Sequence, residues 1–188
     1  MGRTLQLILG LILHHLHCQG VVISKPCKDV SPKEALDYVL GYTLTNDVSA
    51  RKRMFSVPQW GLGKSFDTFL PVGPCLVSSQ ALGDPEDVRL KTTVNGQVMQ
   101  DGDTKDHLWT VREAISEISQ GTTLLPGDLI SMGTPPGEGF KRSPPKFFQH
   151  GDICIVQGSK GLGSLRNRVR VEGRGDLPAA AHPVKAKL

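Results

Sequence analysis

The sequence predicts a β-rich α+β domain, and three observations support this fold class. Gly and Pro contribute 21 and 13 of the 188 residues, and aromatic residues only 5%, a mixture that favours short strands and turns over a helical bundle. Helix-capping patterns occur in only two short segments. About seven or eight segments have the composition and flanking turns of strands. We expect these strands to pack as a sandwich or roll.

Capping residues predict where the two helices begin. Ser31-Pro32-Lys33-Glu34 combines an N-cap residue, a proline in the first turn and a capping-box acid, so we expect a helix as far as Val39. Thr110-Val111-Arg112-Glu113 has the N-cap and capping-box acid of a second helix, which Gln120-Gly121 ends. The apolar stripe of that second helix consists of Val111, Ala114, Ile115 and Ile118.

Turn residues predict the strands. Asn95-Gly96 lies between β-forming residues, which predicts a hairpin over residues 90–99. Residues 42–48 and 66–77 are also expected to be extended. Three more strands, each preceded by a turn that contains glycine, are expected at residues 129–132, 152–156 and 163–169.

Composition divides the chain into three parts. Residues 1–20 are atypical: the apolar run from Leu5 to Leu13 is long enough for a signal-peptide core but too short to span a bilayer, and no good cleavage site follows it, so we do not expect secretion. Residues 21–169 form a partial domain. Residues 170–188 are a basic tail that we expect to be disordered. Because the domain lacks the strands expected before Val21-Val22-Ile23, we expect an unpaired sheet edge there.

Charge and cysteine spacing exclude several classes of protein. The formal net charge of +4 is too mild for a nucleic-acid-binding protein, and no aromatic residues interleave with the basic ones. We therefore expect no nucleic-acid partner, and no firm membrane association. The four cysteines form no Cys-x-x-Cys pair, which excludes a zinc ribbon and a thioredoxin motif and indicates free thiols in a reducing compartment. They are Cys18, Cys27, Cys75 and Cys154.

The first candidate site segment is Asn46-Asp47-Val48-Ser49-Ala50-Arg51, at the expected end of a strand. Function is often found where strands give way to loops. The carboxylate of Asp47 suits a hard divalent cation, which prefers oxygen ligands. The guanidinium of Arg51 suits bidentate binding of a substrate carboxylate. An ordinary Asp–Arg pair at a turn is the structural alternative.

Two further segments contain candidates for anion binding. Gly63-Lys64-Ser65 resembles the end of a P-loop, but the first glycine of that motif would stand at position 58, which is Pro58, so a P-loop is excluded. Lys64 remains a candidate for an anionic ligand, with an ordinary surface lysine as the alternative. The turn Gly133-Thr134-Pro135 presents a backbone N–H and a hydroxyl to an oxyanion, with a plain rigid turn as the alternative. No serine-hydrolase elbow, dinucleotide fingerprint or His-Glu-x-x-His motif is present.

Taken in order and spacing, these motifs resemble the fumarylacetoacetate hydrolase family. The resemblance covers roughly residues 27–169 and is nearest to the eukaryotic domain-containing proteins, which include oxaloacetate tautomerases and acylpyruvate hydrolases. The segments that carry it are Asp47-Val48-Ser49-Ala50-Arg51, Gly63-Lys64-Ser65-Phe66-Asp67-Thr68-Phe69, Pro71, Gly73-Pro74, Val94-Asn95-Gly96, Pro126-Gly127-Asp128, Gly133-Thr134-Pro135-Pro136-Gly137 and Gly151-Asp152.

This resemblance implies a mixed β-sandwich roll, a homodimer and a location in the cytoplasm or mitochondrion. It implies Mg²⁺ or Mn²⁺, which chelates a 2-oxo or 1,3-dicarbonyl acid and stabilises its enolate during hydrolysis, tautomerisation or decarboxylation. By the same resemblance, Asp47 is a metal ligand. Arg51 and Lys64 meet substrate oxygens beside the metal, and Thr134 belongs to the turn that holds the substrate carboxylate.

The sequence departs from the family pattern at several positions, and these departures indicate an alternative to an active enzyme. The family's Glu-x-Glu metal ligands fall at Leu16 and Cys18, and neither of these side chains replaces a carboxylate for Mg²⁺. Met54 stands where a glutamine is usual, and the family's preceding half, with its lid, has no counterpart. The alternative is therefore a catalytically inactive, truncated pseudoenzyme or a fragment from a mis-assembled gene.

Overall fold

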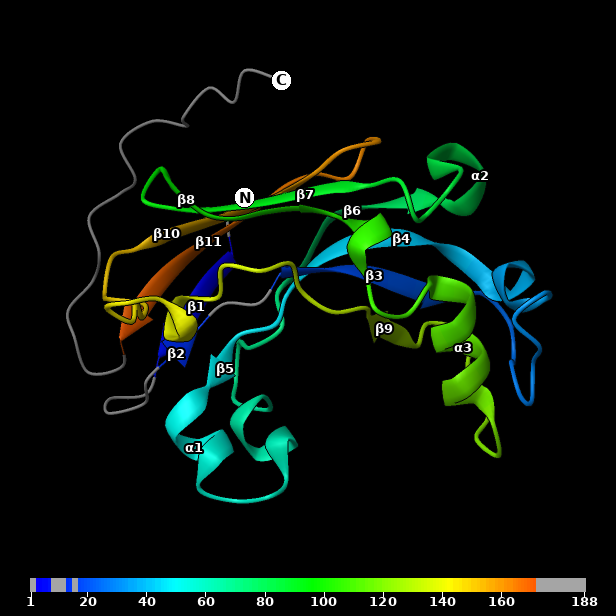
Figure 1. Cartoon of the computed structure of the whole chain (residues 1–188), viewed down its shortest axis with the longest axis horizontal. Helices are drawn as coiled ribbons and strands as arrows, with labels where there is room; N and C mark the ends of the chain where they lie inside the picture. The colour runs from blue at the N-terminus through cyan, green and yellow to red at the C-terminus, as the bar shows by residue number, and fades with distance from the viewer. Residues whose placement is uncertain (1–2, 8–12, 15–16, 172–188) are drawn as a thin grey trace.

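The strands of the chain form two stacked sheets, shown in Figure 1 for a computed structural model that describes residues 3–7, 13–14 and 17–171. A five-stranded sheet has the order β1-β11-β10-β7-β8, and a four-stranded sheet has the order β6-β4-β3-β9. Neighbouring strands in both sheets are antiparallel, except for the parallel pair of β1 and β11. The predicted β-rich α+β class is confirmed.

The five-stranded sheet contains the predicted hairpin. Asn95 and Gly96 connect β7 to β8 with φ values of 50° and 81°, the left-handed conformations that a two-residue hairpin turn requires. The predicted strands at residues 152–156 and 163–169 are also present in this sheet. Its strands are β1 (Arg3–Leu7), β7 (Arg89–Val94), β8 (Gln97–Asp103), β10 (Ile153–Gly158) and β11 (Gly163–Val171).

The four-stranded sheet is built around β3. In this strand, Val21 lies opposite Tyr42 of β4 on one side and Ile130 of β9 on the other. The expected unpaired edge at Val21-Val22-Ile23 is therefore wrong, because β9 pairs with the side that the prediction left open. The strands are β3 (His17–Ile23), β4 (Val39–Asn46), β6 (Val72–Ser78) and β9 (Leu129–Ser131), and a separate short pair is formed by β2 (Leu13–His14) and β5 (Ser49–Ala50).

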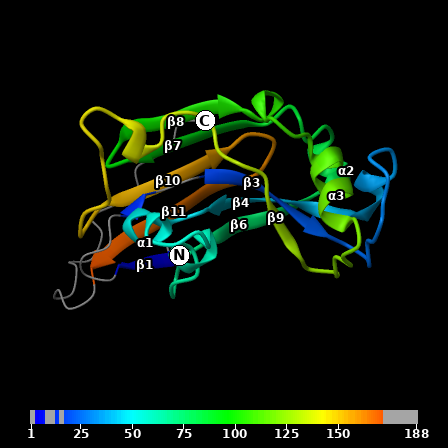
Figure 2. The ribbon, with the colours of Figure 1, turned by 60° about the horizontal axis from the view of Figure 1, so that its bottom comes forward.

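The two sheets are seen from another side in Figure 2. Apolar side chains from both sheets form one buried core. Leu44 of β4 is completely buried there. A Cβ atom added to Gly158 of β10 would lie 2.8 Å from Leu44 Cδ2, so glycine allows the two sheets to approach closely at this point. The largest fully buried hydrophobic side chains are Ile23, Tyr42, Leu44, Met54, Leu90, Ile115 and Leu162.

The helices are short. Thr110 and Glu113 form the predicted capping box at the start of α3. The first predicted helix is instead a single 3₁₀ turn, because Val39 pairs with Ile23 and so belongs to β4. The α-helices are α1 (Arg51–Phe55), α2 (Ser79–Leu82) and α3 (Val111–Ser119), and the 3₁₀ turns are η1 (Ala35–Tyr38), η2 (Trp60–Gly63), η3 (Thr104–Asp106) and η4 (Gly139–Lys141).

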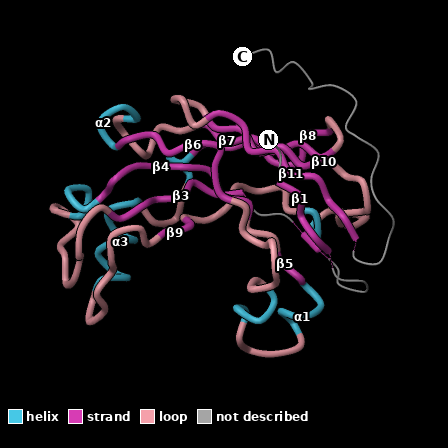
Figure 3. Tube along the Cα trace, turned by 180° about the vertical axis from the view of Figure 1, so that it is seen from behind, coloured by secondary structure: helices cyan, strands magenta, loops and turns pink. Residues whose placement is uncertain are grey.

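One helical hairpin stands apart from the sheets. Seen from behind in Figure 3, α1 follows β5 and projects away from both sheets, and η2 returns alongside it. Within the described ranges, no helix has the length and apolarity needed to cross a membrane. All four cysteines are free, as predicted. The centre of the apolar run, at residues 8–12, and the tail beyond Val171 lie outside the described residues.

Candidate functional site

Asp47 lies where the chain leaves the four-stranded sheet. The preceding Asn46 is completely buried, and its side-chain amide donates a hydrogen bond of 3.0 Å to Asn167 Oδ1 in β11. The backbone N–H of Asn46 also donates to the carbonyl of Pro71 at 3.0 Å. These bonds hold the end of β4 against β11 and against the segment that contains Pro71. They fix the position of the Asp47 carboxylate, whose side chain is 19% exposed.

Lys64 forms an ion pair with Asp47, its ammonium donating a hydrogen bond to Asp47 Oδ2. Lys64 directly follows η2, and Gly63 allows η2 to pack closely on α1. A Cβ atom at Gly63 would overlap Met54 Cγ and would lie 3.0 Å from the carbonyl oxygen of Ala50. Because glycine has no Cβ, η2 can bring Lys64 back to the carboxylate.

Arg51 begins α1 and is only 8% exposed. Its guanidinium lies over the ring of Phe140, 4.2 Å from the centroid, which is cation–π geometry. Burial lowers the pKa of Arg51, whereas the carboxylates of Glu138 and Asp47 oppose that change. A guanidinium stays charged at neutral pH. The site therefore contains two cationic groups: Lys64, which is paired with Asp47, and Arg51, whose charge interacts with the same carboxylate.

Cys18 faces the same group of side chains. It lies in β3 opposite Thr45 and is 3% exposed. Burial raises the pKa of the Cys18 thiol to about 12. The hydroxyls of Ser131 and Thr45 and the ammonium of Lys64 oppose this rise, while Asp47 adds to it. Cys18 is therefore a neutral thiol beside the Asp47–Lys64 pair.

Thr134 lies in a neighbouring hollow of about 460 Å³. Its hydroxyl accepts a hydrogen bond of 2.8 Å from the side-chain amide of Gln100, which also donates to the carbonyl of Pro135. Glu138 lines this hollow, where its carboxylate is paired with Lys141 at 2.6 Å, and its charge also acts on Arg51, so Glu138 connects the hollow to the Asp47 site. The structure thus brings Asp47, Arg51 and Lys64 together and places Thr134 in the adjoining hollow.

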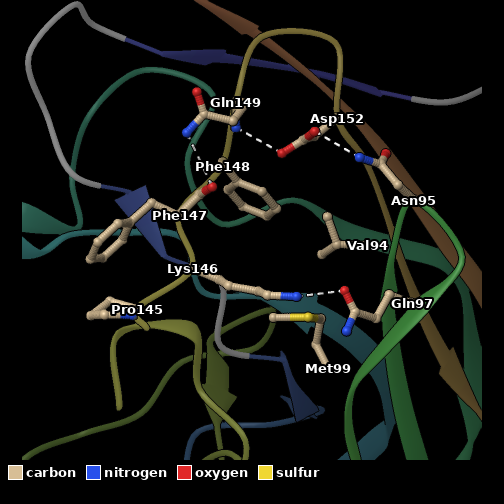
Figure 4. Close-up of a pocket in the computed structure, with 10 residues that line it drawn as sticks. All are labelled: Val94, Asn95, Gln97, Met99, Pro145, Lys146, Phe147, Phe148, Gln149 and Asp152. Carbon is tan, nitrogen blue, oxygen red and sulfur yellow. Dashed lines mark hydrogen bonds between the residues drawn. The ribbon is translucent and has the colours of Figure 1, made fainter. Parts of the chain in front are cut away.

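A second hollow of about 450 Å³ lies between the β7–β8 hairpin and residues 145–152 (Figure 4). Its lysine, Lys146, donates a hydrogen bond of 2.6 Å to Gln97. Its carboxylate, Asp152, accepts hydrogen bonds from the side chain of Asn95 and the backbone of Gln149. None of the predicted site residues lines this hollow, and its charged groups hold the loop to the hairpin, so we assign it a structural role.

Three residues of the site were not predicted from the sequence. Phe140 supports Arg51, Glu138 connects Arg51 to the hollow, and Gln100 orients Thr134. Glu138 and Phe140 follow closely on the Gly133-Thr134-Pro135 turn, which is the nearest sequence signal. Gln100 has no local signal, because its contact with the turn depends on how β8 packs.

The comparisons with known proteins agree with this architecture. The fumarylacetoacetate (FAA) hydrolase C-terminal family matches residues 19–170. The chain belongs to this family. A fumarylacetoacetate hydrolase domain-containing protein 2 homolog of Dictyostelium discoideum is 44% identical, over 80% of this chain and 52% of that protein. A mitochondrial oxaloacetate tautomerase of Rattus norvegicus is 42% identical, over 80% of this chain and 48% of that protein.

Solved structures support the same assignment. The 5-carboxymethyl-2-hydroxymuconate delta-isomerase of Mycobacterium smegmatis superposes with a TM-score of 0.84 at 38% identity, over 92% of this chain and 65% of that one. The fumarylacetoacetate hydrolase of Exiguobacterium antarcticum gives 0.85 at 37% identity, over 90% and 62%. The chain spans about half the length of the curated relatives it matches.

The side chains around Asp47 do not fit the Mg²⁺ or Mn²⁺ ion that the family resemblance implies. Asp47 is a single carboxylate, and Lys64 already neutralises it. Cys18 offers a neutral thiol, whereas hard cations take oxygen ligands. Across the part of the chain that the structure describes, no three His, Cys, Asp or Glu side chains gather as a metal site. Leu16, the other departure from the family pattern, lies outside the described residues.

Proposed function

We propose that this domain binds the enol or enolate form of a 2-oxo or 1,3-dicarbonyl acid and acts as a hydrolase or isomerase on such acids. The observation that carries the proposal is the meeting of Arg51 and Lys64 beside Asp47. Relatives named as an oxaloacetate tautomerase and as a 2,4-didehydro-3-deoxy-L-rhamnonate hydrolase support it, at 42% and 44% identity.

The two cations suit different parts of such a substrate. The planar guanidinium of Arg51, which lies over Phe140, suits two parallel hydrogen bonds to the substrate carboxylate. The ammonium of Lys64 suits the oxygen on carbon 2, where charge develops as the enolate forms. Asp47 orients that ammonium through the ion pair. Thr134 and the Gly133 backbone N–H suit a further oxygen of the substrate in the adjoining hollow.

Of the reactions that the family resemblance implies, tautomerisation requires the fewest functions from these residues. The enol loses the proton on the oxygen of carbon 2 to water, and carbon 3 of the enolate then takes a proton from water, so the residues of the site have to stabilise only the enolate charge between these two transfers. Hydrolysis of a carbon–carbon bond needs a positioned water as well. We therefore infer that enol–keto conversion is the activity that Arg51, Lys64 and Thr134 support best.

The alternative is a catalytically inactive member of the family. The thiol of Cys18 beside Asp47 favours this alternative, because the site then lacks a second carboxylate.

We also propose a homodimer, and a mitochondrial or cytoplasmic location. Apolar side chains that are exposed by half or more on the projecting hairpin support association: they are Phe55, Trp60 and Leu62. Relatives from Rattus norvegicus and Bos taurus are named as mitochondrial. Sedimentation velocity tests the dimer. A single species with the mass of one chain contradicts it.

An absorbance assay of enol-to-keto conversion of oxaloacetate tests the activity. We expect the chain to accelerate the decay of the enol above the rate in buffer, and Lys64→Met to lose most of that acceleration. Lys146→Met is the matched control, because Lys146 lies in the separate hollow of Figure 4. A wild-type rate equal to that in buffer would reject the proposal in favour of the inactive alternative.

A further inference from the structure

Cys18 lies on the face of the four-stranded sheet from which the Asp47 site is built. Thr45 is opposite Cys18 in the register of β3 and β4, and its hydroxyl lies 3.0 Å from the hydroxyl of Ser131 on β9. Asp47 comes two residues after Thr45, directly beyond the end of β4, and its carboxylate is close enough for its charge to add to the raised pKa of the Cys18 thiol. Three neighbouring segments therefore present a thiol, two hydroxyls and one carboxylate to the same space.

This set of atoms is a poor site for a divalent cation. Sites for Mg²⁺ combine one or two carboxylates with neutral oxygens and waters, and a thiol is a poor ligand for such a hard cation. The single carboxylate of Asp47 has the ammonium of Lys64 as its partner. A divalent ion would have to displace that ammonium while gaining only one anionic ligand.

We infer that Cys18 is the residue that keeps this site free of divalent cations, and that the ammonium of Lys64 takes the place of the cation beside Asp47. A carboxylate at position 18 would add a second anionic ligand on the same face, beside the hydroxyls of Thr45 and Ser131. One substitution, Cys18→Glu, should therefore create binding of Mn²⁺ by this chain. The inference concerns metal binding alone and does not depend on the proposed reaction.

Mn²⁺ titration of the full chain, followed by the electron paramagnetic resonance signal of the free ion, tests the inference. The wild-type chain should show no binding below millimolar Mn²⁺, and Cys18→Glu should bind at least tenfold more tightly. Cys18→Gln is the matched control, because it has the size of Glu without the charge, and it should behave like the wild type. Adding Asp47→Asn to Cys18→Glu should abolish the gain, because both carboxylates are required.

Thermal unfolding supplies a second measurement on the same proteins. Mn²⁺ should raise the melting temperature of Cys18→Glu and leave that of Cys18→Gln unchanged, because only binding to the folded state stabilises it. If the longer side chain prevents folding, Cys18→Asp and Cys18→Asn form an equivalent pair closer to cysteine in volume. Binding of Mn²⁺ by the wild-type chain in the micromolar range, or equal binding by the acid and amide variants, would overturn the inference.

Discussion

The close packing of η2 on α1 predicts that Gly63→Ala displaces Lys64 from Asp47. The added Cβ would overlap Met54 Cγ and lie 3.0 Å from both the Ala50 carbonyl oxygen and the Met54 backbone nitrogen. A change of the Met54 rotamer could relieve the overlap with Cγ, but it cannot relieve the other two contacts, which are with backbone atoms. The hairpin has to open instead. Because Lys64 is the next residue in the chain, its ammonium moves with η2.

The size of the effect follows from the distances. Non-bonded atoms prefer separations of about 3.5–4.0 Å, so the Met54 side chain has to move and η2 has to shift by roughly a few tenths of an ångström from the backbone of α1 to accept the new methyl group. Overpacking of this kind typically costs about 1–3 kcal/mol of stability. Gly61 provides the matched control in the same 3₁₀ turn, because a Cβ at Gly61 would meet nothing within 4 Å.

Urea unfolding and the oxaloacetate assay together measure this prediction. We expect Gly63→Ala to lose about 1–3 kcal/mol in the free energy of unfolding and to lower the rate of enol conversion, while Gly61→Ala changes neither by much. Equal stability and equal rates for the two variants would refute the claim that Gly63 holds Lys64 in place.

Three further predictions concern other parts of the chain. Thr110→Ala removes the N-cap of α3 and should lower the free energy of unfolding by about 1 kcal/mol, measured by urea denaturation; no change would mean that the cap is dispensable. A thiol reagent at pH 8 should label only Cys75 in the folded protein and all four cysteines in denaturant, because the other three are buried; fast labelling of Cys18 would contradict its burial. Stability should fall as pH rises from about 9 towards 12, because burial raises the pKa of Cys18 and Cys154 to about 12 and the unfolded thiols therefore lose their protons first. Melting temperatures at pH 8 to 11 measure this slope, and it should be shallower in Cys154→Ala; identical slopes would show that the thiols are not its source.

Local chemistry allowed much of the fold to be predicted from the sequence. The hairpin at Asn95-Gly96 and the capping box of α3 each depend on residues within one turn, and both are confirmed. The first helix was overestimated because the pairing of Val39 with Ile23 is not local. The expected edge at Val21-Val22-Ile23 was wrong for the same reason, since β9 arrives from much later in the chain.

In the candidate site, too, the local features were predictable from the sequence and the contacts between distant segments were not. Asp47 at a strand end and Lys64 after two glycines were recognisable from the sequence, and the structure joins them in an ion pair. The position of Arg51 on the ring of Phe140 depends on how a distant loop crosses α1. The neighbourhood of Cys18 depends on the register of β3 with both β4 and β9. Such contacts between segments have no local sequence pattern.

We propose that Arg51 and Lys64 form an anion site for a 2-oxo acid beside Asp47. Calorimetric titration with oxalate, a planar dianion that mimics the enolate of such an acid, tests this most directly. We predict that oxalate binds the wild-type chain. Loss of a charge-assisted contact of about 1.5–3 kcal/mol should weaken that binding by roughly tenfold to a hundredfold in Arg51→Met, whereas Lys146→Met should bind like the wild type. Equal affinities in all three proteins, or no binding by the wild type, would contradict the account.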